Sequence, residues 1–468
     1  MKHLLPASFA ALTLLAPALL AQTPATPASP AAPVAQAAPA APIPPPVFKP
    51  LVEKLDLKDG DSIVFLGDSI THQCLYTQYV EDYFYTRYPK MRLHFHNAGV
   101  GGDRAADALT RFDEDVAPYQ PKYVTILLGM NDGTYRDFDK TVFDTYQAGM
   151  TTILDKIEGL GATAIPMTPT MFDARAKRIK ASLDEPRNTY YNGVLALYGT
   201  WLREVAEVRG LGFVDMYSPL NSITAQQRKK KANWTMIPDG VHPGPVGQTV
   251  MAVAIIDNIV ARSQVSQVVI AEKDGKLGAT AANGTLTGFQ QSGDGVSFTL
   301  AANALPWVLP PDAAEGPTLT ALGHRYGNEK VTVRNLKPGK YELKIDGTPV
   351  GQWTDGQLAF GVELEGNVKT PQYQQALKIA MLNKQRNETA YHPLRDQYSQ
   401  LKGKRRALAK ADAEKDPQLE AKQTEFAAWY TDQKAKVAEL LGKAKEIETQ
   451  IYAANQPQPR KYEFALVK

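Results

Sequence analysis

The chain has 468 residues, of which 44% are hydrophobic and 22% are charged, and its formal net charge is +3. This length predicts two or three domains, and the composition is that of an ordinary globular protein with enough apolar residues for a sizeable core. A net charge this small argues against nucleic acid as a partner. Cys74 is the only cysteine, which excludes an intramolecular disulfide, and we interpret it as a packing residue.

The N-terminus has the features of a secretory signal. Residues 1–21 start with positive charge, continue as an apolar stretch and offer Ala21 at a plausible cleavage position. They predict a signal peptide, with no stable membrane span left after its cleavage. Residues 22–50 are dominated by alanine and proline and predict a disordered linker. Export without disulfides fits a bacterial periplasm or exterior, so we expect a secreted or periplasmic protein.

Residues 51–265 alternate short apolar runs with amphipathic stretches. The apolar runs are typical of buried strands and lie at 63–66, 93–96, 124–128, 163–167 and 212–216. The helical patterns lie at 75–88, 105–112, 141–158, 187–209 and 245–262. Repeated strand–helix units predict a parallel sheet with helices on both faces, which is a three-layer α/β/α sandwich of flavodoxin-like type.

The pattern changes near residue 266. Short strands with turn signals between them are expected at 268–271, 296–300, 330–333, 341–345 and 358–364. Residues 266–369 therefore predict a small antiparallel, β-sandwich-like accessory domain. Residues 370–468 contain two apolar seams with spacings of three and four, which predict an antiparallel helical hairpin or helices packed on the β domain. Residues 462–467 predict a strand that closes the β domain.

Four short segments contain the groups needed for acyl transfer by a serine. They are Gly67-Asp68-Ser69-Ile70, Gly99-Val100-Gly101-Gly102-Asp103, Gly129-Met130-Asn131-Asp132 and Asp239-Gly240-Val241-His242. This chemistry needs an attacking hydroxyl, a base, an orienting carboxylate and an oxyanion hole. The first three segments follow predicted strands, and open parallel sheets bind ligands beyond the carboxyl ends of their strands. The four segments are therefore expected to meet at one edge of the sheet.

These segments resemble the four blocks of the SGNH hydrolase superfamily, also called GDSL esterases, in the order that the family name gives. The resemblance covers the α/β region, less than half of the chain, and implies the same α/β/α fold. It implies Ser69 as nucleophile, His242 as base and Asp239 as the residue that orients the base. It also implies an oxyanion hole formed by Ser69, Gly102 and Asn131. The first block ends in isoleucine where the family name has leucine.

Each of these residues also has an ordinary structural interpretation. Ser69 could cap the helix that follows it, although Asp68 could take that role and leave the serine facing the cleft. Asn131 could form an Asx turn, and the aspartate before His242 could be a helix cap. Gly102 is chosen among three glycines because it directly precedes an aspartate. The four blocks together favour the catalytic interpretation.

Other polar clusters are interpreted as structural. His94 and His96 lie on one face of a strand, but the sequence places no Asp, Glu or Cys partner with them, so we predict polar cover at a strand edge. We expect neither a metal nor another cofactor. His72 borders the predicted cleft without an assigned role. The basic run at 228–231 predicts a solvated loop, with attraction of anionic glycans as the alternative.

These observations predict an exported serine esterase that removes short acyl groups, with acetyl as the expected group, from a small molecule or polysaccharide. The carbohydrate substrate follows from the resemblance, the export signal and the accessory β domain. Lipid or thioester hydrolysis is the enzymatic alternative, and an envelope or glycan-binding protein with a degenerate hydrolase site is the non-enzymatic one. The oligomeric state is left open. Residues up to about 262 are expected to fold alone, unless the later region covers an apolar face of the α/β region.

Overall fold

The computed structural model describes residues 47–176 and 187–467. The predicted signal peptide and linker residues 22–46 lie outside this part of the chain. Val47–Lys468 cluster as one unit. Among the described residues, no helix has the combination of length and apolar character needed to cross a bilayer.

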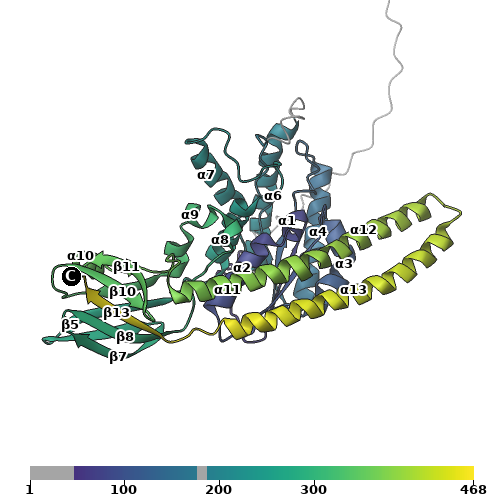
Figure 1. Ribbon diagram of the computed structural model, residues 1–468. Coiled ribbons are helices and arrows are strands. Elements are labelled where there is room, and N and C mark those ends of the chain that lie inside the picture. Colours follow the sequence, from purple (N-terminus) through teal and green to yellow (C-terminus); the bar gives the residue numbers. More distant parts are fainter. Residues whose placement is uncertain (1–46, 177–186, 468) are drawn as a thin grey trace, which may run out of the picture. The chain divides into compact units, whose positions relative to one another are not determined.

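The N-terminal α/β region is built on a parallel sheet (Figure 1). Its strands are β1 (Ser62–Gly67), β2 (His94–Gly99), β3 (Tyr123–Leu127) and β4 (Thr163–Pro166), in the order β2-β1-β3-β4. Every residue of β3 is buried, as is every residue after the first in β1 and β2. Strands buried in this way are covered on both faces, and the predicted α/β/α fold is confirmed.

Helices join these strands and cover the sheet. They are α1 (Ser69–His72), α2 (Leu75–Arg87), α3 (Ala105–Asp115), α4 (Lys140–Gly159), α6 (Arg187–Arg209), α7 (Tyr217–Arg228) and α8 (Pro245–Ile259), with a short 3₁₀ turn η1 (Ala117–Tyr119). All residues of α2 after Leu75 are buried, polar ones such as Glu81 and Asp82 included. A helix buried on every side needs a second layer outside it, and later parts of the chain supply that layer.

The strand predicted at 212–216 is not formed. Only isolated bridges connect Val52 with Gly212 and Met167 with Val214. The hydroxyl of Thr168 accepts hydrogen bonds from the N–H groups of Met216 and Tyr217, at 2.8 and 2.9 Å. Gly212 and Val214 still donate backbone hydrogen bonds to the β4 segment. The Thr168 side chain instead holds the backbone where α7 begins, a helix that the sequence pattern did not predict.

One residue of the basic run at 228–231 differs from the predicted solvated loop, while 229–231 are exposed and follow the helix, as predicted. Arg228 ends α7 and donates two hydrogen bonds to the carboxylate of Asp173, at 2.7 and 2.9 Å. Its side chain is 15% exposed and that of Asp173 is 1% exposed. The first residue of the run is therefore part of a partly buried ion pair and does not belong to a solvated loop.

Two further sheets form a β sandwich (Figure 1). Their strands are β5 (Ser266–Lys273), β6 (Lys276–Ala282), β7 (Gly284–Ser292), β8 (Gly295–Ala302), β9 (Glu329–Val333), β10 (Lys340–Ile345), β11 (Thr348–Thr354), β12 (Val362–Glu363) and β13 (Arg460–Leu466). One sheet has the order β11-β10-β13-β8-β7 and the other β12-β9-β5-β6. The prediction of purely antiparallel pairing is wrong at one place, because β5 and β9 are parallel.

The strand predicted at 358–364 is only partly formed, because its first three residues belong to a helix. Thr354 and Gln357 form a reciprocal cap, in which each backbone N–H donates to the other's side chain, and α10 (Asp355–Phe360) follows. Gly361, with φ +95°, ends this helix in a conformation that favours glycine. Only the two residues of β12 remain as strand, so local capping outweighed the apolar pattern.

The C-terminal helices pack on the α/β region. The predicted alternative, in which they pack on the β domain, is wrong. They are α11 (Pro371–Arg386), the π turn η4 (Asn387–Tyr391), α12 (His392–Ala413) and α13 (Leu419–Ala454), and α12 and α13 form the predicted hairpin. Apolar residues of α11 and α13, among them Ile379 and Ile451, belong to the same core as the parallel sheet. The tyrosine hydroxyl of Tyr391 donates to the carbonyl of Phe95 in β2 at 2.7 Å.

The segment between β8 and β9 also enters the α/β core. It contains η2 (Pro311–Ala313), α9 (Gly316–Leu319) and η3 (Gly323–Gly327). Trp307 is 3% exposed and its indole N–H donates to the carbonyl of Tyr79 at 2.9 Å. The β sandwich has a separate core of its own, which includes Phe298, Leu343 and Phe464.

Candidate active site

Ser69 begins α1 directly after β1, at the carboxyl edge of the parallel sheet. Asp68 caps this helix, because its Oδ1 accepts the N–H of Ile70 at 2.9 Å. The cap frees the serine hydroxyl for another partner. That partner is His242, whose Nε2 lies 2.8 Å from Ser69 Oγ.

Asp239 holds the imidazole of His242 in place. Its Oδ2 lies 2.7 Å from His242 Nδ1, while its Oδ1 accepts the backbone N–H groups of Val241 and His242 at 2.9 and 2.7 Å. Partial burial raises the pKa of Asp239, but the hydrogen bonds from His242 and Val241 outweigh burial and bring the pKa to about 2. An ionised carboxylate at Nδ1 favours the tautomer that leaves Nε2 free to accept the serine proton.

Asn131 lies after the end of β3, and three groups orient its side-chain amide. Its Nδ2 lies 3.1 Å from the carbonyl of Asp103 and 3.3 Å from Oδ2 of Asp68, while its Oδ1 accepts the hydroxyl of Tyr135 at 3.0 Å. The amide N–H₂ group therefore faces the loops that carry Ser69 and Gly102. An N–H₂ group fixed in this way can donate to a developing oxyanion.

Two backbone N–H groups beside the asparagine are available as further donors. In the described part of the chain, the N–H groups of Ser69 and Gly102 donate no hydrogen bond. Gly102 has φ +67°, a left-handed conformation that favours glycine. A Cβ atom at this position would meet only Lys402 Nζ, at 3.7 Å, so there is space for a side chain. Glycine is therefore favoured by the backbone conformation and by the open approach to its N–H group.

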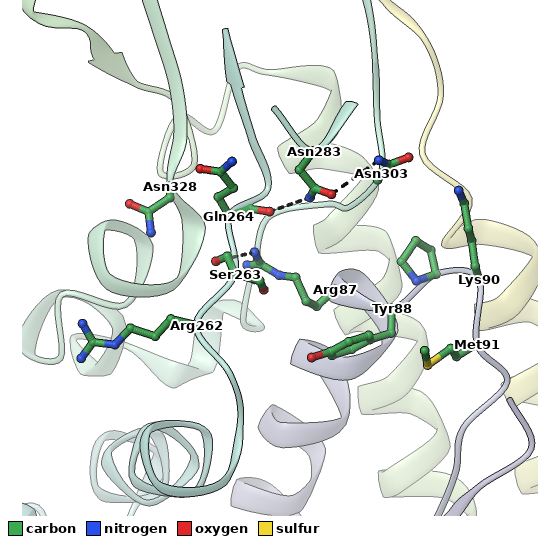
Figure 2. A pocket seen from close by; sticks show the side chains of 11 residues that line it. Arg87, Tyr88, Lys90, Met91, Arg262, Ser263, Gln264, Asn283, Asn303 and Asn328 are labelled. Atoms are coloured by element: carbon green, nitrogen blue, oxygen red, sulfur yellow. Dashed lines mark hydrogen bonds between the residues drawn. The ribbon is translucent and has the colours of Figure 1, made fainter. Parts of the chain in front are cut away.

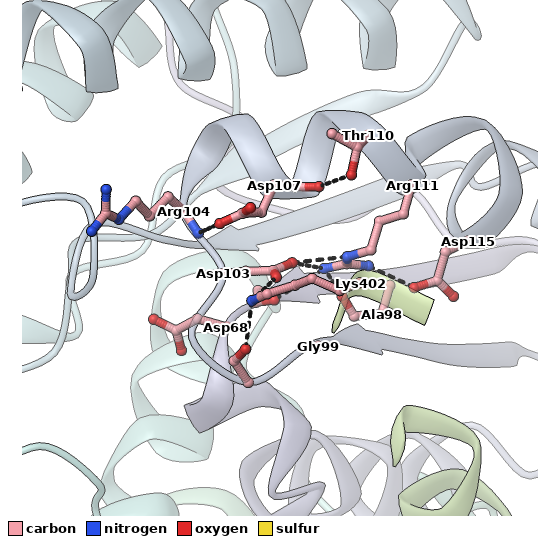
Figure 3. A network of polar contacts seen from close by, with 12 residues as sticks. Asp68, Ala98, Gly99, Asp103, Arg104, Asp107, Thr110, Arg111, Asp115 and Lys402 are labelled. Carbon is pink, nitrogen blue, oxygen red and sulfur yellow. Dashed lines mark hydrogen bonds and ion pairs between the residues drawn. The ribbon is translucent and has the colours of Figure 1, made fainter. Parts of the chain in front are cut away.

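A lysine from the C-terminal helices fixes the loop that contains Gly102. Lys402 lies on α12, and its Nζ donates to the carbonyl of Gly101 at 2.6 Å and to Oδ1 of Asp103 at 2.8 Å. Figure 3 shows Lys402 beside Asp103, in the loop between β2 and α3. The lysine thus contacts the residues on both sides of Gly102. Sequence analysis missed it because 299 residues separate it from Asp103 and no motif surrounds it.

Asp103 also belongs to a buried network with Arg111 and Asp115 (Figure 3), which extends to a second residue of α12. Arg111 donates to Asp103 at 2.8 Å, to Asp115 at 2.6 Å and to the carbonyl of Ala98 at 2.8 Å. The fully buried Arg395 donates two hydrogen bonds to Asp115, at 2.7 and 2.9 Å. Burial raises the pKa of Asp115, but Arg395 above all, with His96 and Arg111, lowers it well below its usual range.

The two histidines of β2 have separate partners. His96 is 1% exposed and lies 3.0 Å from Asp115, so the prediction of polar cover at a strand edge is wrong for this residue. His94 is 53% exposed and lies 3.1 Å from Glu448 of α13. Burial lowers the pKa of His96 to about 4, although Asp115 opposes this shift. These residues are ion-pair and hydrogen-bond partners of structural carboxylates.

Two other carboxyl groups near the site have raised pKa values. Complete burial raises the pKa of Asp68 to about 7, although the N–H of Ile70 opposes the shift. Burial raises the pKa of Asp132 to about 6, against the N–H groups of Ala105 and Gly129 that its carboxylate accepts at 2.9 and 3.0 Å. Asp132 thereby ties the end of β3 to the start of α3.

Cys74 is buried and its thiol donates to the carbonyl of His72 at 3.2 Å. Burial raises its pKa to about 12, so it has no thiolate at neutral pH and behaves as the packing residue predicted. Among the described residues, His72, His392 and Asp396 are the group of three that could hold a metal ion, with ligand atoms within 4.8 Å of one another. None of the three contributes a side chain to the Ser69, His242 and Asp239 arrangement.

Known proteins resemble this chain in sequence and in structure. The model of a GDSL-like lipase/acylhydrolase family matches residues 65–250. An acetylxylan esterase of Geobacillus stearothermophilus is 26% identical over 228 residues, which are 44% of this chain and 96% of that protein. A solved structure, described as a gut microbial diltiazem-metabolizing enzyme, covers 89% of this chain and 100% of its own with a TM-score of 0.74 and 25% identity. The structural likeness therefore extends beyond the α/β region.

Proposed function

Since the chain belongs to the SGNH/GDSL hydrolase superfamily and is a carboxylic ester hydrolase, we propose that it is an exported serine esterase that removes acetyl groups from a carbohydrate. The observation that carries this proposal is the chain of contacts from Ser69 Oγ to His242 Nε2 and from His242 Nδ1 to Asp239. The acetylxylan esterase relative supports both the acetyl group and the carbohydrate.

In the proposed reaction, Ser69 Oγ attacks the ester carbonyl while its proton moves to His242 Nε2. The tetrahedral oxyanion accepts hydrogen bonds from the N–H groups of Ser69 and Gly102 and from Asn131 Nδ2. Collapse of this intermediate breaks the ester C–O bond, and the leaving alkoxide takes the proton from His242. Water then attacks the acetyl-serine with His242 as base, and acetate leaves. Asp239 stays ionised throughout and stabilises the imidazolium.

The experiment that tests the reaction measures acetate release by the full chain and by Ser69→Ala. We expect hydrolysis of p-nitrophenyl acetate by the full chain and a loss of about 10⁴-fold or more in the variant. Circular dichroism of the variant checks that its fold is kept. Equal turnover by the two proteins would overturn the assignment of Ser69, and strong glycan binding without any turnover would favour a binding protein.

The substrate is tested with a panel in which acyl length and parent molecule vary separately. Acetylated xylan, p-nitrophenyl acetate and p-nitrophenyl palmitate are compared, with diltiazem included because the structural neighbour is described as metabolizing it. We expect the highest kcat/KM on acetyl esters and release of acetate from the polysaccharide. A preference for palmitate would favour the lipid alternative.

Export is a separate part of the proposal and rests on the sequence of residues 1–21. We expect the protein in a periplasmic or extracellular fraction, with a new N-terminus close to residue 22. N-terminal sequencing of the fractionated protein measures this, and a full-length chain in the cytoplasm would contradict it.

A further inference from the structure

A cavity of about 690 Å³ lies where the end of α2 meets the segment after α8 and the loops of the β sandwich (Figure 2). Its wall includes three cationic side chains, Arg87, Lys90 and Arg262. Among the described residues that line it there is no aspartate or glutamate. The cavity therefore has a positive wall without a counter-charge of its own.

Arg87 is the buried member of this set. It is 5% exposed, donates to the carbonyl of Ser263 at 3.1 Å and to that of Tyr326, and its Nε has no partner. Among the described residues, no carboxylate forms an ion pair with it. Carbonyl groups satisfy some of its hydrogen bonds but do not neutralise its charge, so an anion in the cavity would be stabilised by it.

Neutral amide side chains form much of the remaining wall. They belong to Gln264, Asn283, Asn303 and Asn328. Asn283 is held by the carbonyls of residues 264 and 265, at 2.6 and 2.9 Å. The side chains of Gln264 and Asn328 make no hydrogen bond with other described residues. Amides offer a donor and an acceptor side by side, which matches the hydroxyl groups of a sugar.

An aromatic ring supplies the apolar part of the wall. Tyr88 follows α2, and Figure 2 shows its ring beside Met91, below the side chain of Arg87. Its ring is fixed by stacking on Phe84, with centroids 5.7 Å apart. Cations, amides and an aromatic ring around a cavity this large suit a ligand with a charge, several hydroxyl groups and an apolar face.

The cavity is remote from Ser69. The helix α2 returns antiparallel to β1, so its last residue lies at the amino edge of the sheet, whereas Ser69 follows β1 at the carboxyl edge. A six-residue strand separates these edges, and at about 3.3 Å per residue the separation is about 20 Å. A ligand in this cavity therefore cannot contact the reacting ester.

We propose that this cavity is a second binding site for a sugar that carries a carboxylate, such as a uronic acid residue. A small inorganic anion would use the cations but would leave the amides and the aromatic wall without partners. Binding itself does not depend on the esterase reaction. Only its consequence rests on the proposed function, since an acidic polysaccharide held here would remain close to the enzyme and would be deacetylated at a higher effective concentration.

The test measures direct binding of trigalacturonate to the full chain by titration calorimetry at low salt. Cellotriose is the neutral control and inorganic phosphate is the control for a simple anion site. We expect trigalacturonate to bind at least about tenfold more tightly than either control, and its affinity to fall as NaCl is added. Equal binding of cellotriose, equal binding of phosphate, or no binding of trigalacturonate would each overturn the proposal.

The variant that probes the wall is Lys90→Gln with Arg262→Gln, because both side chains are exposed and their removal leaves the core intact. We expect its affinity for trigalacturonate to fall by about tenfold. The matched control is Lys54→Gln with Lys443→Gln, two exposed lysines outside the cavity, which makes the same change in net charge and should bind as the unaltered chain does. Equal affinity of all three proteins would place the ligand elsewhere.

Hydrolysis of p-nitrophenyl acetate separates this proposal from the esterase proposal. We expect the Lys90→Gln, Arg262→Gln variant to keep its rate on this small ester, since the cavity is remote from Ser69. Ser69→Ala should lose that rate and keep its affinity for trigalacturonate. Loss of binding in Ser69→Ala would show that the sugar occupies the active site and would overturn the second site.

Discussion

The β sandwich and the C-terminal helices both follow the α/β region, but they are joined to it in different ways. The sandwich keeps an apolar core of its own. The helices share the core of the parallel sheet and place Arg395 and Lys402 in the polar network behind the active site. The change in sequence pattern after the α/β region therefore marks a separate core for the sandwich, whereas the helices belong to the core of the α/β region.

The largest expected effect comes from ending the chain at Arg262. This removes Trp307 and the helices that cover α2, so apolar and ionised groups that are buried in the full chain become exposed. We expect an insoluble or unfolded product, contrary to the expectation from composition that residues up to about 262 fold alone. Soluble expression and circular dichroism measure this. A folded product active on p-nitrophenyl acetate would show that the helices are dispensable.

The next prediction isolates one contact of the helices. Arg395→Ala leaves the buried carboxylate of Asp115 without its bidentate partner, and we expect a loss of about 3 to 5 kcal/mol in the free energy of unfolding. Urea denaturation measures it. The control is Arg406→Ala on the same helix, whose side chain is 58% exposed in its pair with Asp107. We expect that change to cost less than about 1 kcal/mol, and equal costs would contradict the comparison.

Lys402→Met tests whether the helices position the loop around Gly102. We expect kcat on p-nitrophenyl acetate to fall by about 10- to 100-fold with little change in KM, because a loosened oxyanion donor affects mainly the transition state. Lys402→Arg should restore part of the rate, since it can still donate to Asp103. Lys410→Met, which removes an exposed charge farther along α12, is the control and should leave kcat unchanged.

The smallest expected effect is a pH dependence of stability that arises within the α/β region. Burial raises the pKa of Asp68 in the folded state to about 7, above the ordinary value of an unfolded aspartate. The folded state therefore binds this proton more tightly, and stability falls as pH rises from about 4 to 7. Asp239 has the opposite sign, because its pKa of about 2 makes stability fall as pH drops below about 4.

Asp68→Asn removes the first of these contributions and keeps a side chain that can cap α1. The free energy of unfolding of the unaltered chain should fall as the pH rises from 5 to 7. We expect this fall to be smaller by about 2 kcal/mol in the variant. Urea denaturation at the two pH values measures the difference. Asp139→Asn, at the exposed cap of α4, is the control, and a pH slope identical in all three proteins would contradict the prediction for Asp68.

The sequence predicted the parts of the structure that depend on local pattern. Strands buried on both faces are continuous apolar runs, and the four blocks placed Ser69, Asn131 and His242 where the structure has them, with their catalytic roles still predictions. The strand predicted at 212–216 is reduced to isolated bridges, and α7 begins where a distant side chain, Thr168, accepts two backbone N–H groups. The residues of α12 that support the site were missed because lone basic residues on a polar helix resemble surface residues until their partners are known.

The place of β13 sets an order in which the sandwich can form. This strand pairs with β8 on one side and β10 on the other, yet in the chain it comes after α11, α12 and α13. While the polypeptide is emerging, β8 and β10 each present an open edge, and no nearby segment can cover them. The helices must be synthesised, and brought back by a long-range closure, before the sheet is complete. The sandwich is therefore most exposed to misassociation during this interval, which makes synthesis the stage at which its yield is decided.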